Sequence, residues 1–250
     1  MLRDIKKNMS QSIHIFDTPE ATARAVAELM QQKAKEKFKQ SLPYNVALSG
    51  GNTPKLLFQI LAEDFQDSMP WHILRLFWVD ERCVPPTHAE SNFGMTYENL
   101  LKQVPIHEAN IFRMTGEADP QKESARYATL LEAQLPMVNG LPKFDLVLLG
   151  MGDDGHTASI FPNNLNMLQY ESTVAVALHP TSGQKRITLT GNVINAAGQV
   201  VFLITGSSKS GVLRQIIQHE SGFEQYPASY IQSGSVAFYL DKAAASELPL

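Results

Sequence analysis

Short apolar runs of strand length alternate with helical patterns along nearly the whole sequence. The runs lie at residues 12–16, 44–48, 73–79, 110–113, 144–149, 173–178, 186–190, 200–205 and 236–240. Several are apolar throughout, which is typical of parallel strands covered on both faces. Because strands that alternate with helices build a mainly parallel sheet with helices on both sides, we predict an α/β fold.

Proline marks three of the predicted helix starts. Each proline follows a residue that can cap a helix, and the pairs are Thr18-Pro19, Thr53-Pro54 and Asp119-Pro120. Two further helices are predicted to begin at Ser91 and near Ser207 or Ser208. The pattern contains no internal repeat or obvious linker, so we predict one domain over residues 1–250.

Charge and cysteine content exclude several classes of protein. The 250 residues carry 25 acidic and 21 basic side chains, a net charge of −4, so no overall positive field favours nucleic acid or an anionic membrane. The single cysteine, Cys83, forms no intrachain disulfide and no cysteine zinc cage. The first 16 residues lack the apolar stretch of a secretory signal, and no run is long enough to span a membrane. We expect a cytoplasmic protein.

Small residues follow the run at residues 44–48 and lead into a helix. They are Ser49, Gly50, Gly51, Asn52 and Thr53. Ligands of an open α/β sheet bind beyond the carboxyl ends of its strands, and free amides at a helix start attract anions. The loop is therefore a candidate anion site, although a tight turn without a ligand explains the same residues. Its spacing matches neither the Walker loop nor the dinucleotide fingerprint.

Two cations stand close to strand ends. Lys209 follows the run at residues 200–205 and is predicted to lie in the opening turn of a helix, where a cation opposes the helix dipole and indicates a negatively charged partner. Arg186 opens the strand at residues 186–190 and can offer two parallel hydrogen bonds to a phosphate. Plain surface cations are the alternative interpretation for both.

Three charged residues, Asp80, Glu81 and Arg82, directly follow the run at residues 73–79. Their position predicts that they lie at the mouth of the same cleft. A structural ion pair that caps the sheet is the competing interpretation. The neighbouring Cys83 has no local sign of activation, and we interpret it as a small core residue.

The densest group of reactive side chains follows the run at residues 144–149. Three glycines within residues 150–155 loosen the chain, and Asp153, Asp154 and His156 lie within four positions. Histidine is suited to remove a proton from water near neutral pH, and a nearby carboxylate can orient its ring. A metal site is the alternative, but no second histidine stands at helical ligand spacing, so we predict no metal.

Together and in order, these segments resemble the 6-phosphogluconolactonase family, within the larger group that includes glucosamine-6-phosphate deaminases and ribose-5-phosphate isomerases. The matching segments are residues 49–54, 80–85 with His88, Ser91 and Asn92, 150–162, 185–189, 206–209 and 227–229. Each segment alone is weak evidence for the family, but their occurrence together in this order is specific for it. The resemblance runs from Ser49 to about Ile231.

The resemblance implies a Rossmann-like three-layer α/β/α fold of the glucosamine-6-phosphate deaminase, ribose-5-phosphate isomerase and CoA-transferase type. It also implies hydrolysis of 6-phospho-D-glucono-1,5-lactone to 6-phospho-D-gluconate in the oxidative pentose phosphate pathway, without a cofactor. We expect His156 to act as the base, Asp154 to orient it and Arg82 to stabilise the oxyanion. The expected substrate-binding residues are Ser49, Gly50, Gly51, Asn52, Thr53, Asp80, Arg186 and Lys209. The expected assembly is a monomer or homodimer.

Two departures separate the chain from its deaminase relatives. Phe161 stands where they carry a catalytic glutamate, and Arg82 stands where they tend to carry tyrosine. Both favour lactone hydrolysis over an isomerase or deaminase reaction. A non-catalytic sugar-phosphate sensor is the second alternative, and the retention of His156 with Asp154 argues against it.

Overall fold

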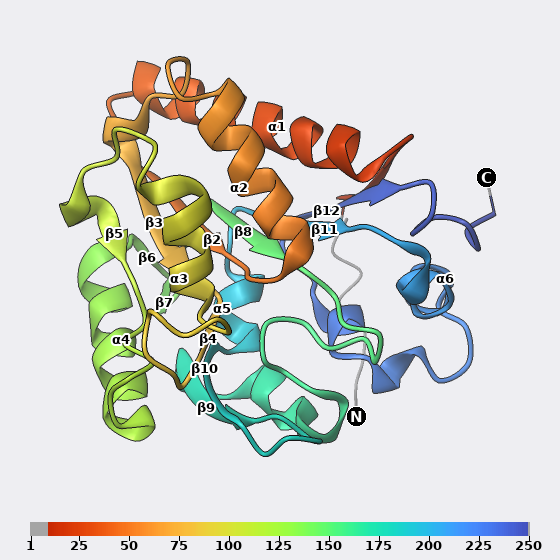
Figure 1. The fold of residues 1–250 in the computed structure, drawn as a ribbon. Coiled ribbons are helices and arrows are strands. Elements are labelled where there is room, and N and C mark those ends of the chain that lie inside the picture. Colours follow the sequence, from red (N-terminus) through yellow and green to blue (C-terminus); the bar gives the residue numbers. More distant parts are fainter. Residues whose placement is uncertain (1–9, 250) are drawn as a thin grey trace.

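A seven-stranded, wholly parallel sheet forms the centre of the computed structural model, which describes residues 10–249 (Figure 1). Its strands, in spatial order, are β1 (Ser10–Phe16), β12 (Ser235–Asp241), β11 (Gln199–Ile204), β8 (Leu146–Leu149), β2 (Tyr44–Leu48), β3 (Leu74–Trp78) and β5 (Ile111–Phe112). The predicted α/β fold with a mainly parallel sheet is confirmed. The prediction of no secretory signal concerns a segment whose residues 1–9 lie outside the described part.

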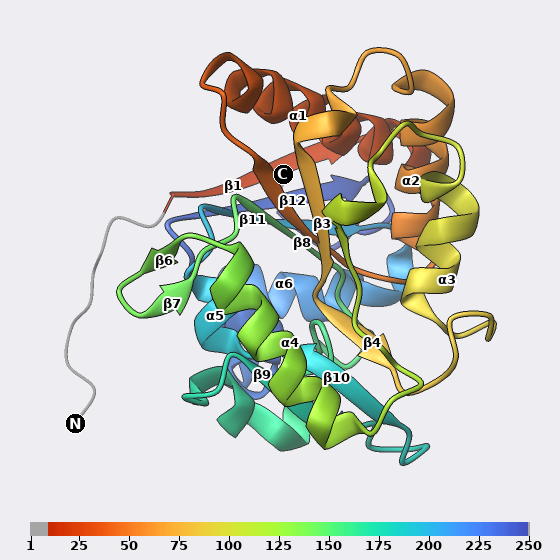
Figure 2. The ribbon, with the colours of Figure 1, turned by 90° about the vertical axis from the view of Figure 1, so that its left-hand side faces the viewer.

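Helices cover both faces of this sheet and complete three layers (Figure 2). One face carries α1 (Pro19–Lys39) and α2 (Asn52–Asp64), and the other carries α4 (Pro120–Gln134), α5 (Gly191–Asn195) and α6 (Ser210–Gln218). Alternate residues of each strand enter opposite cores: along β2, Val46 and Leu48 pack toward α1 and α2, and Ala47 packs toward the other layer. Burial on both faces explains why these strands are largely apolar, as predicted, with Asn45 as the polar exception in β2.

A second, antiparallel sheet begins where the chain leaves the carboxyl end of β3. It contains β4 (Asp80–Arg82), β10 (Lys185–Leu189) and β9 (Val174–Leu178). Two of the predicted strands therefore belong to this small sheet rather than to the parallel one. The three charged residues expected at a loop mouth form β4 itself, because the chain continues straight from β3 and pairs with β10. A two-stranded hairpin, β6 (Met137–Val138) with β7 (Leu141–Pro142), was not predicted.

Short helical segments connect the main elements. They are α3 (Asn92–Thr96), η1 (Trp71–Ile73), η2 (Tyr97–Leu101), η3 (Glu108–Asn110), η4 (Pro162–Gln169), η5 (Ser207–Lys209), η6 (Phe223–Gln225) and η7 (Pro227–Tyr230). Within residues 10–249, none of the helices combines the length and the apolar character that crossing a membrane requires.

Three predicted helix caps are confirmed. Thr18 Oγ1 accepts a hydrogen bond from Ala21 N at the start of α1. Asp119 Oδ1 accepts one from Lys122 N at the start of α4, and Ser91 Oγ accepts one from Gly94 N at the start of α3.

The predicted cap at Thr53 is wrong. Helix α2 already begins at Asn52, and its cap is Gly51, whose φ of +104° lies in the region that favours glycine. The Thr53 hydroxyl instead shares a 2.8 Å hydrogen bond with the hydroxyl of Thr205. The loop after β2 is thereby fastened to the end of β11.

The strand order reverses between β2 and β8. From β2 the chain moves outward through β3 and β5, and it then returns to the other side of β2 as β8 before moving outward again. In open α/β sheets the carboxyl ends of the strands at such a point flank a ligand crevice. The loops that follow β2 and β8 therefore face each other, as Ser49 and Gly150 do.

We expect Tyr127→Phe to lower the free energy of unfolding by about 1–3 kcal/mol, the cost of an unsatisfied buried donor. The buried Tyr127 hydroxyl accepts a hydrogen bond from Trp78 N (3.1 Å) and donates one to Phe112 O (3.0 Å), so the substitution leaves the Trp78 amide unpaired. Urea denaturation measures the change. Tyr97→Phe removes a hydroxyl from an exposed side chain and should have little effect. Equal losses in the two variants would contradict this account of Tyr127.

Candidate functional site

A cavity of about 200 Å³ lies at the crevice between the carboxyl ends of β2 and β8. Its lining combines backbone, cationic and imidazole groups from several loops and from the small sheet: Ser49, Gly50, Gly51, Asp80, Arg82, Asn92, Gly150, Met151, Gly152, His156, Ala158 and Arg186. Drug-sized ligands occupy roughly 300–1,000 Å³, so this cavity suits a smaller metabolite. Predicted residues from four separate segments meet here.

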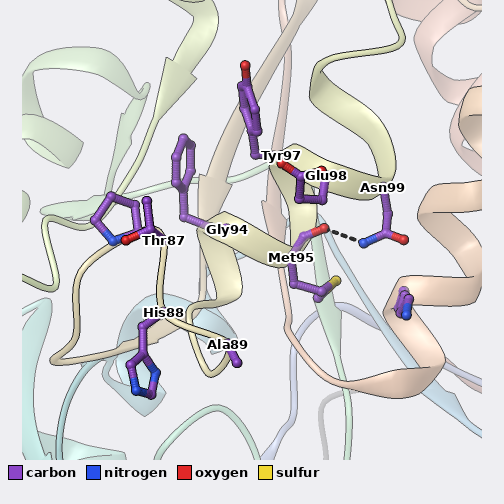
Figure 3. A pocket seen from close by; sticks show the side chains of 11 residues that line it. Thr87, His88, Ala89, Gly94, Met95, Tyr97, Glu98 and Asn99 are labelled. Atoms are coloured by element: carbon purple, nitrogen blue, oxygen red, sulfur yellow. Dashed lines mark hydrogen bonds between the residues drawn. The ribbon is translucent and has the colours of Figure 1, made fainter.

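A larger hollow of about 700 Å³ lies on the outer side of α3 (Figure 3). Lys55, residues 86–89 and the outer surface of α3 and η2 line it, and Asn99 Nδ2 donates to Met95 O within it. Its surface is mostly apolar, and only His88 and three scattered charged or phenolic groups are titratable. Because reactive groups converge in the smaller cavity, that cavity is the candidate active site.

Gly50 has no room for a side chain. A Cβ at this position would lie 1.8 Å from Asn92 Oδ1, so the glycine allows the Asn92 carboxamide to lie directly against the loop. Asn92 Nδ2 is held in turn by Asp80, donating to its backbone oxygen (2.9 Å) and to Oδ1 (3.1 Å). The loop of residues 49–53 (the glycine loop) is therefore packed against α3 and β4.

Asp80 is buried, and protein donors occupy its carboxylate. Besides Asn92 at Oδ1, Ser159 Oγ donates to Oδ2 at 2.6 Å from the loop that follows β8. Asp80 lines the cavity as predicted, but its strongest contacts join two walls of the site.

Glu81 points away from the cavity and stabilises the start of α3. Its carboxylate accepts hydrogen bonds from the backbone N of Arg82, Asn92 and Phe93 and from Ser91 Oγ, at 2.8–3.0 Å. Burial raises the pKa of Glu81 above its usual value, although these donors act in the opposite direction. Glu81 is thus structural, but through hydrogen bonds at the start of α3 and not through the ion pair that the competing interpretation expected.

Arg82 and Arg186 lie opposite each other in the pairing of β4 with β10. Arg82 Nη1 donates to Glu90 O (2.6 Å), while its buried Nε has no partner among the described residues. Burial lowers the pKa of Arg186, and the charge of Arg82 acts in the same direction while Asp80 opposes both. Two cations held together at the wall of a cavity form a site for an anion.

His156 and Asp154 form a close pair. Their Nδ1 and Oδ1 atoms are 2.6 Å apart, and the same Oδ1 accepts the backbone N–H of His156. Burial alone would raise the pKa of Asp154, but the hydrogen bond and charge of His156 outweigh it and hold that pKa below its usual value. Since Asp154 is a carboxylate, Nδ1 carries the proton and Nε2 is free to act as a base.

Three predicted binding residues lie outside the cavity lining. Asn52 is the exposed first residue of α2, and Thr53 is bound to Thr205. Lys209 belongs to the short helix η5 rather than to the opening turn of α6, and its Nζ lies 3.2 Å from Asp153 Oδ1. It therefore approaches the loop that follows β8 without entering the cavity.

Other contributors were missed or assigned no role. Ser159 and Asn92 lie in segments of the resemblance, but only the structure shows that both bind Asp80. His179 has no sequence signal and packs behind the site against Phe161. Burial raises the pKa of Cys83 to about 11, as expected of a core thiol rather than a nucleophile. The described residues contain no group of three or more His, Cys, Asp or Glu arranged to hold a metal.

Comparisons with known proteins agree with this architecture. The family described as glucosamine-6-phosphate isomerases/6-phosphogluconolactonase matches residues 17–240. A 6-phosphogluconolactonase of Treponema pallidum is 42% identical over 203 residues, 81% of this chain and 83% of that protein. One from Haemophilus influenzae is 42% identical over 205 residues, 81% of this chain and 86% of that protein.

Solved structures extend the similarity to almost the whole chain. The crystal structure of devB protein superposes with a TM-score of 0.90 and 37% identity, covering 96% of this chain and 100% of that one. The 6-phosphogluconolactonase of Trypanosoma brucei superposes with a TM-score of 0.87 and 29% identity, with the same coverage. By its sequence and its fold, this chain belongs to the family of glucosamine-6-phosphate isomerases and 6-phosphogluconolactonases.

Proposed function

We propose that this chain hydrolyses 6-phospho-D-glucono-1,5-lactone to 6-phospho-D-gluconate, a step of the oxidative pentose phosphate pathway. The observation that carries the proposal is the His156–Asp154 pair at a small cavity whose wall holds two arginines. The similarity to proteins named 6-phosphogluconolactonase supports the same reaction. The partner is then a small sugar-phosphate lactone, hydrolysed by one domain acting as a monomer or homodimer in the cytoplasm without a cofactor.

His156 is the general base of the proposed mechanism. Its Nε2 takes a proton from water as the water oxygen bonds to the lactone carbonyl carbon, and Asp154 stabilises the resulting imidazolium through Nδ1. The bond from that carbon to the ring oxygen then breaks, and His156 returns the proton to the departing oxygen. Water and lactone are thereby converted to the open-chain acid with no other reactant.

In this mechanism, cations and backbone amides bind the phosphate of the substrate and stabilise the oxyanion that forms when water adds to the carbonyl carbon. We assign stabilisation of the oxyanion to Arg82, an effect worth roughly 3 kcal/mol where such donors have been removed from other enzymes. We assign the phosphate to Arg186, the glycine loop with Ser49, and Lys209. Lys209 then exchanges its contact with Asp153 for the phosphate.

A deaminase or isomerase reaction of the family type needs a carboxylate that is absent here. At the position that corresponds to it, Phe161 is fully buried and is not part of the cavity lining. A phenyl ring neither accepts nor donates the proton that such a relay moves. Testing glucosamine 6-phosphate for ammonia release separates the two reactions.

The direct test is formation of 6-phosphogluconate from freshly prepared lactone, followed with a coupled dehydrogenase. A control without enzyme is essential because the lactone also hydrolyses spontaneously. Binding of the lactone with no rate above that control would favour the sensor alternative.

We expect His156→Ala to lower kcat by about 10²- to 10⁴-fold, since it removes the base that activates water. The coupled assay measures this loss, and circular dichroism confirms that the variant is folded. His88→Ala is the matched control, because His88 is partly exposed beside the larger hollow and should keep wild-type turnover. Wild-type turnover by folded His156→Ala would exclude the proposed base.

We expect Lys209→Ala to raise KM for the phosphorylated lactone about tenfold or more, the scale of a lost charged hydrogen bond, with a smaller fall in kcat. Unphosphorylated gluconolactone should react equally with both enzymes. Lys242→Ala, which removes a similar surface ion pair with Asp17, serves as the control. An unchanged KM for the phosphorylated substrate would argue against a phosphate contact by Lys209.

A further inference from the structure

One buried aromatic ring, that of Phe161, packs against two residues that line the candidate site. Phe161 is fully buried, and it lies where the loop that follows β8 meets η4, as the residue just before that helix. Its ring centroid lies 4.9 Å from that of His156, 5.6 Å from Cζ of Arg186 and 5.2 Å from the ring of His179. These three side chains come from different segments: the β8 loop, β10 and the turn between β9 and β10.

We propose that Phe161 is a positioning residue for the reaction, because its ring sets the orientation of the His156 imidazole and the Arg186 guanidinium together. The inference rests on the proposed lactone hydrolysis, in which the first group acts as base and the second binds substrate. Phe161 itself touches no substrate, since it does not line the cavity.

His156 needs a second constraint besides Asp154. The side chains of the pair are 27% and 44% exposed, so water can compete for their hydrogen bond, and a partly exposed contact of this kind constrains the imidazole only weakly. The Phe161 ring, inclined at 48° to the imidazole, limits rotation of the His156 ring from the buried side.

Arg186 depends on the ring even more directly. Within residues 10–249 it forms no ion pair, and its Nε donates to Gln184 Oε1 at a long 3.3 Å. A guanidinium over an aromatic face is attracted by the negative face of the ring. This contact helps to keep a partly buried cation at the cavity wall, where Asp80 acts on it by charge but forms no direct ion pair with it.

His179 is the third side chain that packs against the Phe161 ring. Its Nδ1 accepts the backbone N–H groups of Thr181 (3.3 Å) and Ser182 (3.2 Å), which favours the neutral form. Burial lowers the pKa of His179, and the charges of Arg186 and His156 act in the same direction. The neutral imidazole meets Phe161 edge-on at 74° and holds the ring in place without adding a cation.

Phe161→Leu tests the proposal, because leucine keeps an apolar side chain but removes the ring face. We expect kcat to fall roughly 10- to 100-fold, as misplaced catalytic groups cause elsewhere, and KM for the phosphorylated lactone to rise. Phe144→Leu is the matched control: Phe144 is equally buried in the same core, just before β8. It should lose similar thermal stability with unchanged kcat and KM.

Two further measurements separate positioning from general destabilisation. The downfield proton resonance of the His156 Nδ1–H should broaden in Phe161→Leu and stay sharp in Phe144→Leu. Phe161→Tyr keeps the ring face and should recover most of the kcat that Phe161→Leu loses. If Phe161→Leu does not fold, Phe161→Met, which also removes the ring face, takes its place with the same expected losses, and unchanged kcat and KM would overturn the proposal.

The proposal is overturned if folded Phe161→Leu changes kcat and KM no more than Phe144→Leu does, or if Phe161→Tyr is as slow as Phe161→Leu. If the wild-type protein does not hydrolyse the lactone, while the resonance still broadens only in Phe161→Leu, the proposed function fails and the positioning of His156 stands.

Discussion

Two adjacent buried carboxylates, Asp80 and Glu81, hold the walls of the site together. Because neighbouring side chains of a strand point in opposite directions, Asp80 reaches Asn92 and Ser159 at the cavity, while Glu81 reaches the first amides of α3. A buried carboxylate without donors costs several kcal/mol, and each of these four oxygens has at least one donor. The positions of α3, β4 and the β8 loop follow from satisfying these charges.

The sequence predicts most of the central sheet because burial on both faces leaves a local signal. The run at residues 44–48 coincides with β2, since all five residues are buried and all but Asn45 enter one core or the other. The same signal misleads at β9, which is apolar throughout, and at β10, whose last three residues are buried; both belong to the second sheet. Their sheet is decided by β4, whose charged residues contain no strand pattern and whose pairing with β10 spans about a hundred residues.

The candidate site was also only partly predictable from the sequence. The loops after β2 and β8 could be placed together from sequence, because parallel strands deliver their carboxyl ends to one edge. The contacts within these loops could not be predicted. Glycine is required at Gly50 because a Cβ there would lie 1.8 Å from Oδ1 of Asn92, which belongs to another element. Phe161 could be recognised as the wrong residue for a deaminase, but its packing against His179 depends on a turn with no motif. Lys209 does lie in the opening helical turn, η5, that leads into α6, but its side chain contacts Asp153 and does not line the cavity.

The pairing of Arg82 with Arg186 is unfavourable for the stability of the fold but suits the binding of an anion. Like charges directly opposite each other in an antiparallel pair are destabilising, and here one guanidinium also has a buried, unpartnered Nε. A protein selected for stability alone would place a carboxylate at one of these positions. Such a carboxylate would neutralise the field that an anionic substrate needs. In the proposed reaction, binding of the substrate anion would remove part of the repulsion, so the ligand would stabilise this strand pair. The least favourable contact of the small sheet is thus consistent with its position at the active-site cavity.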